Sequence, residues 1–265
     1  MQLSSLQIHS RPQTDCVYTA CDVRYFRDFG PAFANSVLTN SDFGVHFHIF
    51  NAEPCDIEFC QSIPRVSFSH EHVPLDVFAT ATRLWESLPL DDTKQTNLAR
   101  TQQAMWKGGD ANLQERMQRT YFACVRFVRL RDLYDARHRM FAMDVDAVVR
   151  ARLRSPGDDR AFYIHRIHGA KARYLAGGIW LNAVQSNCGF LDEYAAAITS
   201  HFHDDYIYWG IDQDVLEHIV PKWNHAELPQ EYIDWNMQAH SMVWTAKGNR
   251  KNNLAFLEAK RQFSV

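Results

Sequence analysis

Residues 140–149 read Met-Phe-Ala-Met-Asp-Val-Asp-Ala-Val-Val, and this stretch decides the fold. Its apolar start predicts a buried strand that ends in two carboxylates, Asp144 and Asp146, one residue apart. Because side chains alternate along an extended chain, both carboxylates point to the same side. Carboxylate oxygens are hard ligands that suit Mn²⁺ or Mg²⁺. The stretch therefore predicts a metal site that would neutralise a diphosphate, although Asp-x-Asp by itself is also common in solvated turns.

The composition describes an ordinary soluble globular protein. Its 265 residues are 46% hydrophobic and 22% charged, and the formal net charge of −3 gives no global attraction to nucleic acid or anionic membrane. The chain has no run of about 18 apolar residues and begins without the features of a signal peptide. Its six cysteines show no Cys-x-x-Cys spacing. We expect one cytoplasmic domain, without a membrane span and with reduced thiols.

The first part of the chain alternates strand and helix signals. Residues 16–21 predict a strand that ends at Asp22, and residues 29–38 predict a helix. Two more strands are expected over 45–50 and 66–68. This order favours an α/β fold with a mixed, mostly parallel sheet.

The second part continues the pattern after a polar stretch, residues 89–109, which predicts a loop or a poorly packed helix. The later elements expected from the sequence are strands over 162–167 and 176–182, helices over 191–202 and 211–216, and a basic helical tail from residue 249.

Four motifs occur in a characteristic order: Asp144-Val145-Asp146, Ala-Gly-Gly-Ile-Trp-Leu-Asn at 176–182, Asp-Gln-Asp-Val-Leu at 212–216, and His240 followed by Lys247-Gly248. In this order the chain resembles the GT-A-fold nucleotide-sugar glycosyltransferases. It is most similar to the retaining group that contains glycogenin and bacterial lipopolysaccharide galactosyltransferases. The resemblance implies a single Rossmann-like domain over 1–265, with a nucleotide-binding half at about 1–150 and an acceptor-binding half at about 151–265.

The resemblance also implies the roles of individual residues. A metal, Mn²⁺ or Mg²⁺, would be held by Asp144, Asp146 and His240 and would stabilise the departing diphosphate. Asp212 and Gln213 would line the sugar face opposite the leaving group. The residues expected to bind the nucleotide sugar, a UDP-sugar by preference, are Thr19, Ala20, Asp22, Arg126, Asp144, Val145, Gly177, Gly178, Asn182, Lys247, Gly248 and Lys251.

Several alternatives stay open at this point. The chain departs from the family pattern at 174–178 and after His240, which leaves donor sugar and acceptor undetermined. A glycan hydroxyl is the expected acceptor, to be sought in the 89–112 stretch and the Trp-rich C-terminal third. A protein side chain or a modified nucleobase stays open, because local Arg clusters could contact phosphates. Rival functions are a catalytically silent binding domain and a metal-dependent phosphohydrolase. Three His-x-His pairs, at 46/48, 70/72 and 201/203, are expected to be packing or surface residues rather than a zinc site.

Overall fold

The computed structural model describes residues 1–87, 91–169 and 172–264. Its main sheet has eight strands in the order β1-β4-β3-β2-β5-β8-β7-β9, and a separate ribbon pairs β10 with β6. The strands are β1 Gln7–Ile8, β2 Cys16–Asp22, β3 Gly44–Phe50, β4 Val66–Glu71, β5 Met140–Met143, β6 Ala147–Val149, β7 Phe162–Ile167, β8 Arg173–Leu181, β9 His225–Glu227 and β10 Val243–Thr245. The main helices are α1 Val23–Asn40, α2 Pro54–Ser62, α3 Ala79–Ser87, α4 Asp92–Gly108, α5 Leu113–Leu133, α6 Ser186–His203, α7 Ile211–Ile219 and α8 Leu254–Gln262. Short 3₁₀ turns are η1 Leu75–Phe78, η2 Val220–Lys222, η3 Gln230–Tyr232 and η4 Gly248–Asn252.

The prediction of an α/β fold with a mixed, mostly parallel sheet is confirmed. Strand β2 pairs in parallel with both β3 and β5, β3 with β4, and β7 with β9, whereas β1–β4, β5–β8 and β7–β8 are antiparallel. All seven residues of β3 are buried, as expected for a strand covered on both faces.

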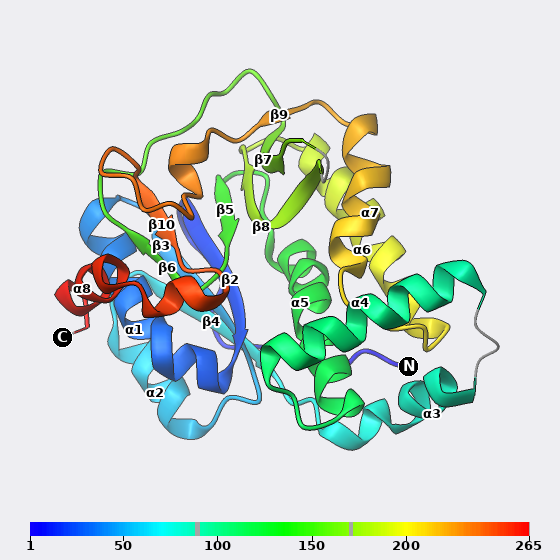
Figure 1. Cartoon of the computed structure of the whole chain (residues 1–265). Coiled ribbons are helices and arrows are strands. Elements are labelled where there is room, and N and C mark those ends of the chain that lie inside the picture. Colours follow the sequence, from blue (N-terminus) through cyan, green and yellow to red (C-terminus); the bar gives the residue numbers. More distant parts are fainter. Residues whose placement is uncertain (88–90, 170–171, 265) are drawn as a thin grey trace.

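Two apolar layers cover the two faces of the sheet. On β2 and β5, Tyr18 and Ala142 belong to the layer that contains α5, α6 and α7, while Val17 and Phe141 belong to the layer beneath α1. Figure 1 shows α1 and α2 on one side of the strands and α5, α6 and α7 on the other. None of the helices in the described chain has both the length and the apolar content needed to cross a membrane.

Helices α1, α4, α6 and α7 differ from their predicted extent, with α6 beginning at Ser186 and α7 ending at Ile219. The helix expected over 29–38 begins at Val23, because the Asp22 side chain caps its first turn by accepting a hydrogen bond from the Tyr25 amide at 2.9 Å. The polar stretch 89–109 forms α4 rather than a loop, capped by Asp91 and ended by Gly109 at a φ of 67°. Residues 89 and 90 of that stretch lie outside the described residues. Helix α4 is mostly exposed, which explains why its sequence carries a weak apolar pattern.

A buried polar ladder crosses β3 and β4. His46 bonds to the hydroxyls of Ser67 and Ser69, at 2.8 and 3.0 Å, and His48 bonds to the Ser69 hydroxyl at 2.9 Å. The ladder ends at Glu71, which accepts a hydrogen bond from Arg129 of α5 at 2.6 Å. The His46/His48 pair therefore has a packing role in the described structure.

This ladder predicts loss of stability in acid. Burial lowers the pKa of His46 to about 3, so the unfolded chain binds an extra proton between that value and its own pKa of 6.5. The free energy of unfolding should therefore fall as pH drops below 6.5, by about 1.4 kcal/mol per pH unit for one such group. Urea denaturation between pH 4 and 6.5 should show that the free energy of unfolding of the His46→Gln variant changes less with pH than that of the wild type. His72 is exposed and serves as the control. An equally reduced pH dependence of the unfolding free energy in the His72→Gln variant would contradict this explanation.

Candidate functional site

A cleft of about 460 Å³ opens at the carboxyl ends of β2 and β5. From β2 the chain continues to β3 and β4 on one side of β2 in the sheet, and β5 lies on the other side of β2. Strands β2 and β5 therefore flank the point where the strand order reverses. Crevices at such points are the usual ligand sites of open α/β sheets. The lining residues are Ala20, Cys21, Asp22, Tyr25, Ala104, Lys107, Gly108, Arg116, Arg119, Phe122, Ala123, Arg126, Asp144, Val145, Asp146, Trp209, Lys247, Gly248 and Lys251.

Cations from two distant segments pair with the carboxylates of the Asp-x-Asp motif. Arg126 of α5 makes an ion pair with Asp144 and lies 3.7 Å from Asp212. The ammonium of Lys251 lies 2.9 Å from the Asp146 carboxylate and donates to the Tyr25 hydroxyl at 2.5 Å. The described structure thus holds the acidic pair between an arginine and a lysine.

The carboxylates of Asp144 and Asp146 have pKa values that are shifted in opposite directions. Burial raises the pKa of Asp146, and the charge of Asp144 adds to the rise against the opposing effect of Lys251. For Asp144, burial also acts upward, but the charge and hydrogen bond of Arg126 outweigh it and leave the pKa below its usual value. Burial raises the pKa of Asp212. Asp144 therefore carries the firmest negative charge of the three.

The C-terminal segment reaches the cleft through the β6–β10 ribbon. Ala147 pairs with Thr245, and the Ala246 amide donates to the Asp146 carbonyl oxygen at 2.9 Å. This pairing brings Lys247, Gly248 and Lys251 to the lining of the cleft, although they lie about 100 residues after Asp146 in the sequence.

The same register carries His240 away from the carboxylates. Val243 pairs with Val149, at the end of β6 remote from Asp146, and His240 precedes Val243 on an exposed turn. Among the described residues, no close group of three metal-type ligands contains Asp144, Asp146 and His240. The structure does not bring the three predicted ligands together, because antiparallel pairing directs the chain before β10 away from the site.

Both predicted glycines make room for protein rather than for a ligand. A Cβ on Gly177 would lie 2.6 Å from an Asp144 carboxylate oxygen, and one on Gly178 would lie 2.6 Å from a side-chain carbon of Ile233. Gly177 therefore lets strand β8 approach the Asp144 carboxylate closely. Neither glycine is among the residues that line the cleft.

The other predicted residues outside the lining have different surroundings. Asn182 donates to the Gly157 and Arg160 carbonyl oxygens and accepts from the Trp180 indole, each at 2.9 Å, which satisfies its side chain within the scaffold. Thr19 is fully buried and alternates away from Ala20. Asp212 and Gln213 lie in the first turn of α7, and the Asp212 carboxylate lies 3.7 Å from the Arg126 guanidinium.

The donor set fits a divalent cation shared with a phosphate ligand. Asp144 and Asp146 line one cleft, and Mg²⁺ in such sites takes one or two carboxylates together with phosphate oxygens and water. A divalent cation would also neutralise the like charges that help raise the Asp146 pKa. The group of three close metal-type ligands that is found among the described residues, Glu53, Cys55 and Asp56, is already bound by Arg27.

Sequence reasoning missed several lining residues. Arg119, Phe122, Ala123 and Arg126 lie on one face of α5, at the spacing that places helical side chains side by side. Extending the helical period back from Arg126 would have found this face. Trp209 belongs to the Trp-rich C-terminal third in which an acceptor site was expected, whereas Tyr25 carries no comparable signal, because tertiary packing alone brings it to the cleft.

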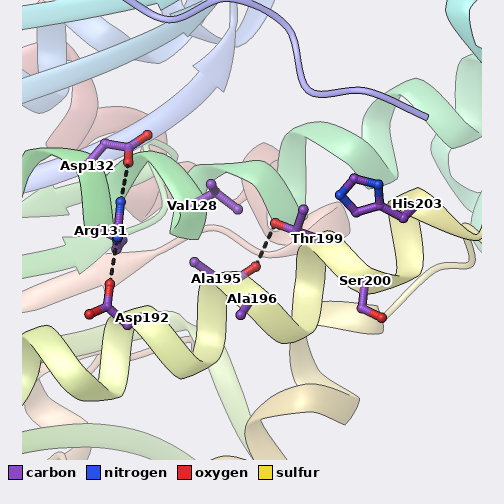
Figure 2. A pocket seen from close by; sticks show the side chains of 9 residues that line it. All are labelled: Val128, Arg131, Asp132, Asp192, Ala195, Ala196, Thr199, Ser200 and His203. Carbon is purple, nitrogen blue, oxygen red and sulfur yellow. Dashed lines mark hydrogen bonds and ion pairs between the residues drawn. The ribbon is translucent and has the colours of Figure 1, made fainter.

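A second hollow, of about 570 Å³, lies between α5 and α6 and contains none of the predicted site residues. Figure 2 shows its alanine-lined middle, with Arg131 bound to Asp132 and Asp192 at one end and His203 at the other. Its ionic groups are paired with each other in the described structure.

Comparisons with known proteins give likenesses of fold. No family model matches the chain, and no curated protein matches it by sequence. Among solved structures, it is similar to the galactosyltransferase LgtC, with 12% identity, a TM-score of 0.49 and coverage of 94% of this chain and 96% of that one. It is also similar to the glycosyltransferase GlyE of Streptococcus pneumoniae TIGR4, with 11% identity, a TM-score of 0.49 and coverage of 93% of this chain and 60% of that one. For mouse xyloside xylosyltransferase 1 the identity is 10%, the TM-score 0.44 and the coverage 89% of this chain and 99% of that one. These solved structures carry glycosyltransferase names, but at such low identity the likeness does not assign an activity to this chain.

Removal of Arg126 tests its place between two carboxylates. The Arg126→Met variant should lose about 3 kcal/mol of unfolding free energy, because the buried Asp212 and the partly exposed Asp144 lose the cation that lies between them. Adding Asp212→Asn to that variant should recover part of the loss. Urea denaturation at pH 7 measures both. A loss below about 0.5 kcal/mol would show that the ion pairs do not hold the site together.

Proposed function

We propose that the chain is a metal-dependent, retaining glycosyltransferase that moves a sugar from a nucleotide diphosphate sugar, preferably a UDP-sugar, to a hydroxyl acceptor. The observation that carries the proposal is the cleft at the β2/β5 switch point, where Asp144 and Asp146 face cations supplied by the C-terminal segment. A diphosphate needs these two groups together, since a carboxylate-bound divalent cation and lysines can share its charge.

The donor's parts match different walls of the cleft. Ala20 and Asp22, at the end of β2, would receive the base and ribose. The diphosphate would lie beside Lys247, Gly248 and Lys251, where the positive φ of Gly248 (62°) leaves the backbone uncovered. Binding requires Lys251 to exchange Asp146 for a phosphate oxygen.

Asp144 and Asp146 would hold the divalent cation. When bound, that ion supplies Lewis-acid stabilisation of the leaving diphosphate. The ion pair with Arg126 fixes the orientation of Asp144, and Gly177 keeps the space that its carboxylate occupies.

Transfer breaks the bond between the anomeric carbon and the diphosphate oxygen, which keeps the electron pair. The acceptor oxygen forms the new bond, and its proton passes to the departing diphosphate oxygen. Positive charge then develops at the anomeric carbon, and a retaining reaction needs a nearby oxygen to stabilise it. Asp212 and Gln213, behind Arg126 at the start of α7, are the candidates, and the Gln213 side-chain oxygen is buried without a hydrogen-bond partner in the described structure.

Hydrolysis and binding of UDP-glucose, UDP-galactose, UDP-GlcNAc and GDP-mannose test the proposal. With Mn²⁺, one donor should turn over slowly, and both EDTA and Asp146→Asn should reduce turnover at least 100-fold, because the diphosphate loses its bound cation. Binding of a donor without turnover would favour a silent binding domain. Cleavage of phosphodiesters without a sugar donor would favour the phosphohydrolase, and the absence of metal-dependent donor binding would reject the glycosyltransferase.

Neighbouring glycines give a matched pair of variants. Gly177→Ala should weaken Mn²⁺-dependent UDP binding about tenfold, because its methyl group displaces the Asp144 carboxylate. Gly178→Ala meets Ile233 instead and should lower the melting temperature without a comparable effect on UDP affinity. Isothermal titration calorimetry and thermal melting of both variants separate the effects. Equal UDP affinities would mean that Asp144 is not held against β8 as the structure describes.

A further inference from the structure

The cleft contains a second group of cations, remote in sequence from those assigned to the diphosphate. Lys107 lies at the end of α4, and Arg116 and Arg119 lie on the first turns of α5. All three line the cleft, together with Trp209. Figure 1 shows α4 and α5 next to each other on the same side of the sheet.

Several contacts fix the Arg116 side chain in this wall. Its side chain is 4% exposed, donates to the Ala104 carbonyl oxygen at 2.6 Å and lies over the Trp209 ring at 4.8 Å. Gly108 makes its position possible, because a Cβ there would lie 2.0 Å from the guanidinium. Its Nε is buried without a hydrogen-bond partner in the described structure.

The charges of this group do not cancel. Arg116 and Arg119 share one fully buried carboxylate, that of Asp110, with Arg119 at 2.8 Å. Two guanidinium groups therefore face one acid, and the exposed Lys107 adds a further cation for which no ion pair is found in the described parts of the chain. The carbonyl end of α4 offsets only part of this surplus. Arg119 remains 32% exposed, so its charge is available to a ligand.

A nucleotide diphosphate sugar does not account for this surplus, since Lys247, Lys251 and the divalent cation already face its two phosphates under the proposed function. We propose that the α4–α5 wall binds an acceptor that carries an anionic group, a phosphate or a carboxylate, recognised by Lys107 and Arg119 with Arg116 holding them in place. The role of this ligand as an acceptor rests on the proposed function, whereas the binding of an anion at this wall does not.

The test is a titration of inorganic phosphate into the protein saturated with Mn²⁺ and UDP. The wild-type protein should still bind phosphate, and the Lys107→Met/Arg119→Met variant should bind it at least tenfold more weakly with unchanged UDP affinity. The matched control is Arg83→Met/Lys94→Met, two exposed or partly exposed cations outside the cleft, which should stay within twofold of the wild type. Phosphate affinity equal in all three proteins, or absent from the wild type, overturns the proposal.

Three sugars in the same titration identify the anionic group. Glucose 6-phosphate binding more tightly than glucuronate assigns a phosphate, the reverse assigns a carboxylate, and neither binding more tightly than glucose overturns the proposal. If the protein does not bind UDP, the proposed function fails. The comparison of the two double variants in free protein still tests the anion subsite, so the two failures are distinguishable.

Discussion

The guanidinium of Arg126 between Asp144 and Asp212 is the interaction on which the site depends. It joins the chain after β5, the middle of α5 and the start of α7. A carboxylate in this half-buried place would repel its neighbours if left alone. With Arg126 present, the pKa of Asp144 stays below its usual value, so Asp144 keeps the negative charge that the proposed cation site requires.

Helix α5 is in turn fixed by polar contacts at Arg126 and one turn further along, at Arg129. Arg129 donates to Glu71 at 2.6 Å, and the Tyr18 hydroxyl donates to the Arg126 carbonyl oxygen at 2.7 Å. Burial acts to raise the pKa of Glu71, but the hydrogen bonds and charges of His48 and Arg129 outweigh burial and hold that pKa below its usual value. The ladder in β3 and β4 thus sets the position of α5, and α5 presents Arg119 and Arg126 to one cleft.

The distribution of charge gives this cleft two cationic walls. Cations from the C-terminal segment lie near the acidic pair, and cations from α4 and α5 line the other wall. Under the two proposals, anions of a donor and of an acceptor would be held by the C-terminal segment and by the α4–α5 segment from the middle of the sequence. The polar stretch examined for an acceptor site, residues 89–112, supplies Lys107 and the buried Asp110 to this arrangement.

The sequence by itself determined the features that depend on near neighbours in the chain. Apolar runs located β2, β3, β5 and β7, and Asp144 and Asp146, expected to lie on one side of the chain, both line the cleft. Contacts between distant residues were decided only by the tertiary structure. The register of β6 with β10 brought Lys251 to Asp146 and carried His240 away, and the packing of α4 against α5 created the second cationic wall. A one-residue spacing fixes side-chain direction locally, whereas strand pairing and helix packing depend on the whole core.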